Sequence, residues 1–497
     1  MNKRLQRLNP EHVAVAMLVA LGAVHVFIFS ALFPFFQVTD EQAHLDMVIK
    51  YSQAHFPVRY AEGSSNTAFY CVLYGAPEYL QTGPPPEKTL LPLWSAPAPL
   101  IEQSLAEFAG SWTASPNIES AQPPLYYSIA GGWWAWCRAM GLDGGNVLYA
   151  LRCLNGLFLM GTILVGWLAA RLIFPENRFV RIAVPALIAC QPQSIYYCIS
   201  NDNLAALTFG LVFLLILKCW SRDVLSLRLG AALGLSFAAV FLTKLTGVPL
   251  LMVAALMLLL KVCFWVKQNK FRSSFPGLLA MSACAGAPCL AWLVWCKVHF
   301  GDWTGDRQKI QFLSWTLKPV AEWFHHPIFS ISGCAYFIGR NISTFWQGEA
   351  LWYRQRLAEP LADGFYICGI LISLGLVFIF LILRPQRFSS LQRAALWFAM
   401  VCLGSLFLFF AWQSVRYDFH GCFYPSSALP YFTSGRLLLG AVIPALVIFA
   451  KSLDLLLLKA NGRLKFGALA VLLLAMLATE IHIDHPVFRS LYDWIHM

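Results

Sequence analysis

VAVAMLVALGAVHVFIFSALFPFF, residues 13–36, shows what class of molecule this is. The run holds about 24 apolar residues, and a helix rising 1.5 Å per residue needs roughly 20 to cross a 30 Å hydrocarbon core. The basic start MNKRLQR precedes it, and no small-residue cleavage site follows it. We therefore expect a retained first membrane span with the N-terminus in the cytoplasm.

Similar apolar runs recur to the end of the chain. Hydrophobic residues make up 58% of the sequence and charged residues 12%, against roughly 45–50% and about 25% in soluble proteins. This composition excludes soluble enzymes, disordered chains and disulfide scaffolds, and we expect the cysteines to be packing residues. The fold class predicted is an all-α polytopic membrane protein with about eleven transmembrane helices, at 13–36, 146–172, 180–198, 203–220, 229–243, 247–266, 275–296, 364–383, 394–412, 437–458 and 466–481.

The net charge of +11 reflects topology and is not a nucleic-acid signal, because most Lys and Arg cluster between alternate apolar runs. The short apolar segment 124–140 must stay on the outer face, since a crossing there would move most of these clusters outside. We therefore expect a juxtamembrane or re-entrant helix at 124–140. The long loops 37–123 and 297–363, and the shorter loop 413–436, then face outward.

The segment FQVTDEQAH follows the first span directly. Thr39 and Gln42 form a capping-box pattern, which predicts a helix that begins at Asp40 and lies on the membrane surface. Asp40, Glu41 and His44 share one face of it, where two ionised carboxylates would suit a base beside a hydroxyl group. Plain N-terminal capping by acids and a DExxH metal site are the alternatives.

Three further groups of polar residues are predicted on the outer side. Asp202 lies in SNDNL between two spans, where it is either a functional group or a helix cap. Lys244 in FLTKLTGVP is an outer cation suited to a lipid phosphate or to ordinary snorkelling. The outer segment 413–440 adds Arg416 and Arg436, and Arg436 would make bidentate phosphate contacts.

Taken in order, these motifs resemble the GT-C superfamily of integral-membrane glycosyltransferases, which use polyprenyl-phosphate-linked sugars. The matching pieces are TDEQAH after the first span, QPPLYY opening a second juxtamembrane helix, SNDN, and FLTKLTG. TFWQGEALW and SGRLLLG are similar to one poorly characterised bacterial branch, in which Pro stands at the position of Thr39 and Tyr at that of Leu437. The resemblance implies a catalytic membrane module over 1–297, with two juxtamembrane helices in its first outer loop. Residues 298–497 then form the second outer loop and the C-terminal spans.

The resemblance also implies roles for single residues. Asp40 would be the general base that deprotonates an extracytoplasmic acceptor as it displaces polyprenyl phosphate with inversion, and Glu41 and His44 would orient it. Asp202 would place a substrate, Lys244 and Arg436 would neutralise the leaving phosphate, and Gln122 would shape the pocket. No metal and no cofactor are expected. The bacterial inner membrane is the expected location, with the active site extracytoplasmic.

Two other functions fit the same polar outer loops. A transporter or flippase of a lipid-linked glycan would also bind such a lipid, but it should place ionisable residues near the bilayer midplane. A non-catalytic membrane assembly subunit would tolerate the replacement of Asp40.

Overall fold

The computed structural model describes residues 9–36, 40–79 and 91–497. Long helices account for most of this part, and its four strands are two residues each. Nine segments within the described residues are long and apolar enough to cross a membrane. They comprise α1 (Pro10–Leu32), α6 (Gly144–Ile173), α8 (Asp202–Trp220), η4 with α10 (Leu245–Lys267), α11 (Phe271–Phe300), α15 (Pro360–Leu383), α16 (Ser390–Arg416), η7 with α17 (Gly435–Leu456) and α18 (Gly462–Asp484). The all-α polytopic fold expected from the sequence is confirmed.

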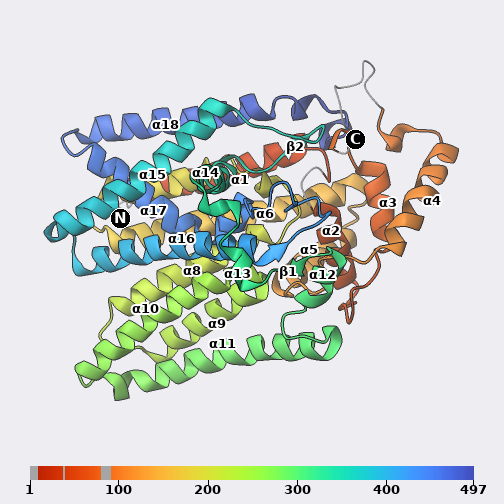
Figure 1. Ribbon diagram of the computed structural model, residues 1–497. Coiled ribbons are helices and arrows are strands. Elements are labelled where there is room, and N and C mark those ends of the chain that lie inside the picture. The colour runs from red at the N-terminus through yellow and green to blue at the C-terminus, as the bar shows by residue number, and fades with distance from the viewer. Residues whose placement is uncertain (1–8, 37–39, 80–90) are drawn as a thin grey trace, which may run out of the picture.

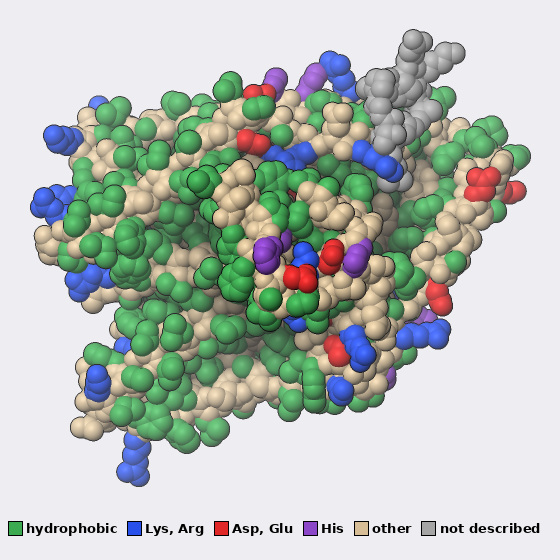
Figure 2. Space-filling model, in the orientation of Figure 1, with side chains coloured by type: hydrophobic (Ala, Val, Ile, Leu, Met, Phe, Trp, Pro, Cys, Tyr) green, Lys and Arg blue, Asp and Glu red, His purple; other side chains and the backbone are tan. Residues whose placement is uncertain are grey.

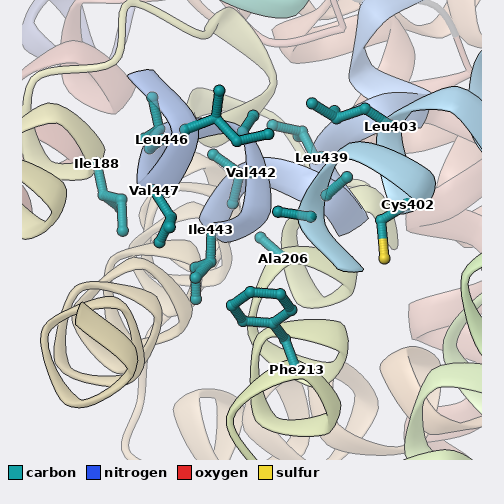
Figure 3. Packing of buried hydrophobic residues seen from close by; sticks show 14 of the residues in the cluster. Ile188, Ala206, Phe213, Cys402, Leu403, Leu439, Val442, Ile443, Leu446 and Val447 are labelled. Atoms are coloured by element: carbon teal, nitrogen blue, oxygen red, sulfur yellow. The ribbon is translucent and has the colours of Figure 1, made fainter. Parts of the chain in front are cut away.

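The long helices run side by side, and α17 (Val442–Leu456) lies at the centre of the bundle (Figure 1). It packs against α8, α15 and α16, and also against α7 (Arg178–Ala189). Val442, Ile443, Leu446 and Val447 of α17 meet Phe213 of α8 and Leu403 of α16 in this core (Figure 3). In the segment Gly435–Leu456, 83% of the most apolar 18-residue window is buried, as expected of a helix at the centre of a bundle.

Two predicted spans differ from expectation. The run 180–198 was expected to be one helix, but α7 ends at Ala189 and the chain continues through the 3₁₀ helix η3 (Ser194–Tyr197). Pro192 accounts for the break, because proline restricts the preceding residue and lacks an N–H donor. The open backbone at this depth is tolerated because it is buried in protein. The run 229–243 forms α9 (Leu227–Thr243), an apolar helix shorter than the nine spans.

The first outer loop packs against one end of the bundle, together with residues near the C-terminus (Figure 1). It forms α2 (Glu41–Ser52), α3 (Ser65–Tyr74) and α4 (Ala98–Ala114), followed by α5 (Leu125–Ala139). As predicted, residues 124–140 make a short helix and not a span. Most residues of α2 are buried, and the helix packs against α3 and α5, so it does not present the separate polar and apolar faces expected of it.

The second outer loop forms short elements over the same end of the bundle. These are α12 (Asp306–Phe312), α13 (Val320–Trp323) and α14 (Ile331–Gln347). Strand β1 (Thr316–Leu317) pairs antiparallel with β4 (Tyr417–Asp418), with Thr316 opposite Asp418, and so joins this loop to the segment after α16. Strands β2 (Leu351–Trp352) and β3 (Gln355–Arg356) form a hairpin. The remaining 3₁₀ helices are η1 (Pro77–Tyr79), η2 (Leu93–Ser95), η4 (Leu245–Gly247), η5 (Pro327–Phe329), η6 (Pro385–Arg387), η7 (Gly435–Ala441), η8 (Val487–Arg489) and η9 (Trp494–His496).

Charged side chains gather at the two ends of the molecule (Figure 2). On the face shown, the charged side chains at the end that carries the N-terminus are Lys and Arg, whereas acidic and basic side chains both appear in the middle and towards the opposite end. Hydrophobic side chains cover the surface between them, as the bilayer requires. All fourteen cysteines are free, in agreement with the packing role expected for them.

Candidate active site

Asp40 lies at the N-terminus of α2 in a left-handed backbone conformation, with φ of 69°. The helix was expected to begin at Asp40 with Thr39 as its cap, but it begins at Glu41 and Asp40 occupies the cap position. Thr39 lies outside the described residues. The Asp40 carboxylate makes no capping hydrogen bond and instead contacts Arg436, with Oδ2 3.1 Å from Nη2. Aspartate tolerates positive φ better than most residues, and this conformation frees its side chain from the helix.

Five motifs that are far apart in sequence meet through a chain of ion pairs. Arg436 links Asp40 to Asp202, whose Oδ2 is 3.8 Å from Arg436 Nε. Asp202 Oδ1 in turn lies 2.6 Å from Lys244 Nζ. Glu349 of the TFWQGEALW motif is 3.6 Å from Arg436 Nε and accepts a hydrogen bond from Ser434. Each cation is therefore compensated by at least one carboxylate, as partly buried charges require.

A second ion pair lies on the other side of His44. Lys309 of α12 is 2.9 Å from Glu119, which lies three residues before the QPPLYY motif begins at Gln122. His44 Nδ1 is 2.7 Å from the hydroxyl of Tyr127, the last residue of that motif. His44 thus stands between the two charged groups and is fixed by the second juxtamembrane helix.

These side chains surround a cavity of about 720 Å³, which is the size of a small-molecule site. Residues from the first outer loop, the α9–α10 connection, α12, α16 and η7 line it. The polar lining includes Asp40, His44, Glu119, Gln122, Lys244, Asp306, Lys309, Gln413, Tyr424, Ser434 and Arg436, and the aromatic lining includes Trp315, Phe410 and Tyr417. The cavity therefore combines both signs of charge with aromatic faces.

Gln122 and Asp202 also meet at this site. Gln122 lines the cavity, and its Oε1 accepts a hydrogen bond of 3.4 Å from Nδ2 of Asn201, the neighbour of Asp202. Pro124 stands at the N-terminus of α5, where a residue without an N–H donor is well tolerated. The QPPLYY and SNDN motifs therefore contact each other.

Burial and neighbouring charges set the ionisation of the groups in this cavity. Burial lowers the pKa of His44, with Glu119 and Asp40 opposing the shift, and the ring is neutral at pH 7. Burial acts to raise the pKa of Glu119, but Lys309 and His44 outweigh it and hold that pKa at about 2. Burial raises the pKa of Glu349 despite the opposing charge of Arg436. A neutral imidazole next to Asp40 is able to accept or pass on a proton.

Glu41 points away from the cavity. Its carboxylate accepts hydrogen bonds from Arg152 Nε and Nη2, at 3.1 and 3.0 Å, and from the backbone N–H groups of Phe36 and Ile199. Glu41 and Arg152 are both almost fully buried. The expectation that Asp40, Glu41 and His44 share one face is wrong, because Asp40 precedes the helix and Glu41 turns towards α6. The DExxH metal site loses Glu41 as an acidic ligand, because the Glu41 carboxylate binds Arg152.

Arg416 also lies outside the cavity lining, although its neighbour Tyr417 is part of it. Its guanidinium stacks on Trp412, 4.6 Å from the ring centroid. The charged cavity residues that the sequence analysis did not single out are Glu119, Asp306 and Lys309, and it also missed Glu349, which contacts Arg436. Glu119 and Glu349 stand beside or within quoted motifs, whereas nothing in the sequence around Lys309 marks it.

Comparison with known proteins gives matches among solved structures only. No family model matches the sequence, and no curated protein matches it. Among solved structures, the chain is similar to ArnT from Cupriavidus metallidurans, crystallised with undecaprenyl phosphate, with 15% identity and a TM-score of 0.45. The match covers 97% of this chain and 74% of ArnT. At this identity and TM-score, the similarity does not identify a substrate for this protein.

Proposed function

We propose that the cavity is the active site of a GT-C-type glycosyltransferase. The enzyme transfers a sugar from a polyprenyl-phosphate donor to a hydroxyl group of an extracytoplasmic acceptor, such as a cell-envelope glycan, lipid or protein. The observation that carries the proposal is the chain of contacts from Asp40 through Arg436 and Asp202 to Lys244. It supports the proposal because it joins a candidate base to two candidate phosphate ligands at one cavity.

In the proposed reaction, Asp40 takes the proton of the acceptor hydroxyl, and the acceptor oxygen attacks the anomeric carbon of the sugar. The bond from that carbon to the phosphate oxygen breaks, the configuration inverts, and polyprenyl phosphate leaves with the electron pair. Arg436 and Lys244 stabilise the charge of the leaving phosphate. Because Arg436 contacts Asp40, a donor phosphate that draws Arg436 away would also release the carboxylate to act as the base.

The remaining cavity residues position these groups. Neutral His44 lies one turn after Asp40 and is held by Tyr127. Asp202 holds Lys244 and Arg436 in place from the other side. Glu41 contributes through its bond to Arg152, which supports the start of α2, and we assign it no chemical step.

Replacing Asp40 by Asn tests the proposal. Asn has nearly the same size and is tolerated at a helix cap, so the variant should fold. The loss of a general base typically costs about 10²–10⁴-fold in rate. The assay is sugar transfer by purified protein in lipid. Monodisperse elution in size-exclusion chromatography and thermal unfolding check that the variant is folded.

Glu102→Gln, in the exposed helix α4, is the matched control and should keep full activity. A well-folded Asp40→Asn protein with wild-type transfer would disprove the mechanism. A wild-type protein that moves a lipid-linked sugar across vesicles without transferring it would establish the transporter instead.

A further inference from the structure

A second cavity, of about 650 Å³, lies between α15 and α16. Both helices pack extensively on α17 and only slightly on each other, so a groove remains between them, with α14 beside it (Figure 1). Side chains of aliphatic and aromatic residues line it, among them Phe337, Ile370, Leu374, Met400, Phe407 and Leu438. The groove is therefore apolar throughout its depth.

This groove is separate from the active-site cavity. Met400, Gly404 and Leu408 of α16 line the groove, whereas Phe409 and Gln413 line the polar cavity. At 100° per residue these two sets lie on different faces of the helix, which adjoin where Leu403 lines the groove and Phe410 lines the cavity. Leu408 is 73% exposed, and both α15 and α16 are candidate membrane spans, so the groove opens towards the hydrocarbon of the bilayer.

The length of the groove matches one leaflet. Its lining runs along α16 from Met400 to Val415, which corresponds to roughly 22 Å at 1.5 Å per residue. One leaflet with its headgroup region is about 20–22 Å thick. At the deep end, one turn before Met400, the rings of Phe378 and Trp397 meet edge to face at 5.8 Å.

Two cations lie at the headgroup end of the groove. Arg416 is the last residue of α16, and its guanidinium stacks on Trp412, which lines the groove. The backbone N–H of Lys318 donates to the Arg416 carbonyl oxygen at 2.9 Å. Within the described residues, neither side chain forms an ion pair, even with the nearby acids Glu322 and Asp418. In contrast, Lys244, Lys309 and Arg436 of the active site are each paired with carboxylates.

We propose that this groove is a binding site for a membrane phospholipid, with one acyl chain between α15 and α16 and the phosphate against Arg416. The occupant is a bilayer lipid and not the sugar donor, because α16 separates the groove from Asp40 and because its depth is that of one leaflet. The proposal does not depend on the transferase assignment. A chain held here would fill the gap between two helices that otherwise touch mainly through α17.

Gly404 provides a sharp test. Gly404 lines the groove, and a Cβ atom built on it meets no heavy atom within 4 Å, so Gly404→Leu adds a side chain there with room for its first carbon. Gly286→Leu on α11 is the matched control, since its Cβ also meets nothing within 4 Å and α11 lies across the molecule from α15 (Figure 1). Arg416→Gln removes the proposed phosphate contact and leaves the groove open.

The experiment uses full-length protein released from nanodiscs of phosphatidylcholine containing diacylglycerol, with retained lipid identified by native mass spectrometry. Wild type and Gly286→Leu should retain one phosphatidylcholine in preference to diacylglycerol. Gly404→Leu should lose it, and Arg416→Gln should lower its occupancy at least about fivefold. Thermal unfolding confirms that each variant is folded.

Three results would overturn the proposal. Gly404→Leu with wild-type retention would place the lipid elsewhere. Equal retention of diacylglycerol would mean that the phosphate is not recognised. Displacement of the retained lipid by added polyprenyl phosphate, one for one, would make the groove part of the donor site.

Discussion

Two adjacent carboxylates, those of Asp40 and Glu41, have opposite surroundings. Asp40 faces the cavity and contacts Arg436, whereas Glu41 is buried against Arg152 and two backbone N–H groups. The difference arises because Asp40 adopts positive φ before the helix, so successive side chains leave the backbone in different directions. Asp40 therefore faces the cavity, and its neighbour Glu41 belongs to a buried ion pair.

Glu41→Gln should reduce stability first and activity only as a consequence. Glutamine keeps the shape but removes the charge opposite Arg152, and breaking a buried ion pair costs about 3–5 kcal/mol. Thermal unfolding in detergent should show a large fall in midpoint, with Glu102→Gln unchanged. If the unfolding midpoint were unchanged and sugar transfer were lost, Glu41 would act in the chemical step.

The Glu119–Lys309 pair should make stability depend on pH in the acid range. The pKa of Glu119 is held at about 2 in the folded protein, against 4.5 for an ordinary glutamate. A lowered folded pKa stabilises the protein above pH 4.5, and this stabilisation is lost as the pH falls towards 2. The midpoint difference between wild type and Glu119→Gln should therefore shrink as the pH falls from 6 to 3. A difference that is independent of pH would show that the pair contributes through packing alone.

At the scale of elements, the position of Arg436 depends on close contact between η7 and α14. A Cβ on Gly435 would lie 1.9 Å from the backbone nitrogen of Phe345, so the two backbones touch. The N–H of Gly435 also donates to Thr344 Oγ1 at 2.8 Å. This contact explains the glycine in SGRLLLG, because any larger residue would push Arg436 away from Asp40.

Gly435→Ala should destabilise the protein by at least about 1–3 kcal/mol, the usual cost of overpacking. Donor binding should weaken as well, because η7 carries Arg436. Gly467→Ala in α18 is the control, since its Cβ meets nothing within 4 Å, and its unfolding midpoint should not fall. Equal midpoints for both variants would contradict the backbone contact.

For the whole molecule, the remaining prediction concerns orientation in the membrane. The end that carries α2 and α5 should face outward, because the basic connections lie at the opposite end. Leu142→Cys, between α5 and α6, should react with an impermeant maleimide on intact cells once the native cysteines are replaced. Arg387→Cys, between α15 and α16, should react only after permeabilisation. Labelling in the reverse pattern would place the cavity in the cytoplasm.

Much of the architecture follows from local properties of the chain. Most of the spans and the short helix at 124–140 were predicted correctly, because apolar length is a property of consecutive residues and the bilayer responds to it directly. The runs 180–198 and 229–243 were the exceptions: the helix break at Pro192 is tolerated only where surrounding protein buries the open backbone, and α9 is shorter than the nine candidate spans.

The sequence also placed Asp40, Asp202, Lys244 and Arg436 in outer segments, and the structure shows that they meet. The sequence did not show that Asp40 faces a cavity and Glu41 a buried arginine, and it did not single out Lys309 and Glu119. The reason is that the surroundings of a charged side chain depend on which elements pack against it. Burial makes an unpaired charge costly, so partners from distant segments determine where each side chain points. Those partners come together only when the helices pack. For this reason the sequence predicted the membrane spans but not the charge pairs.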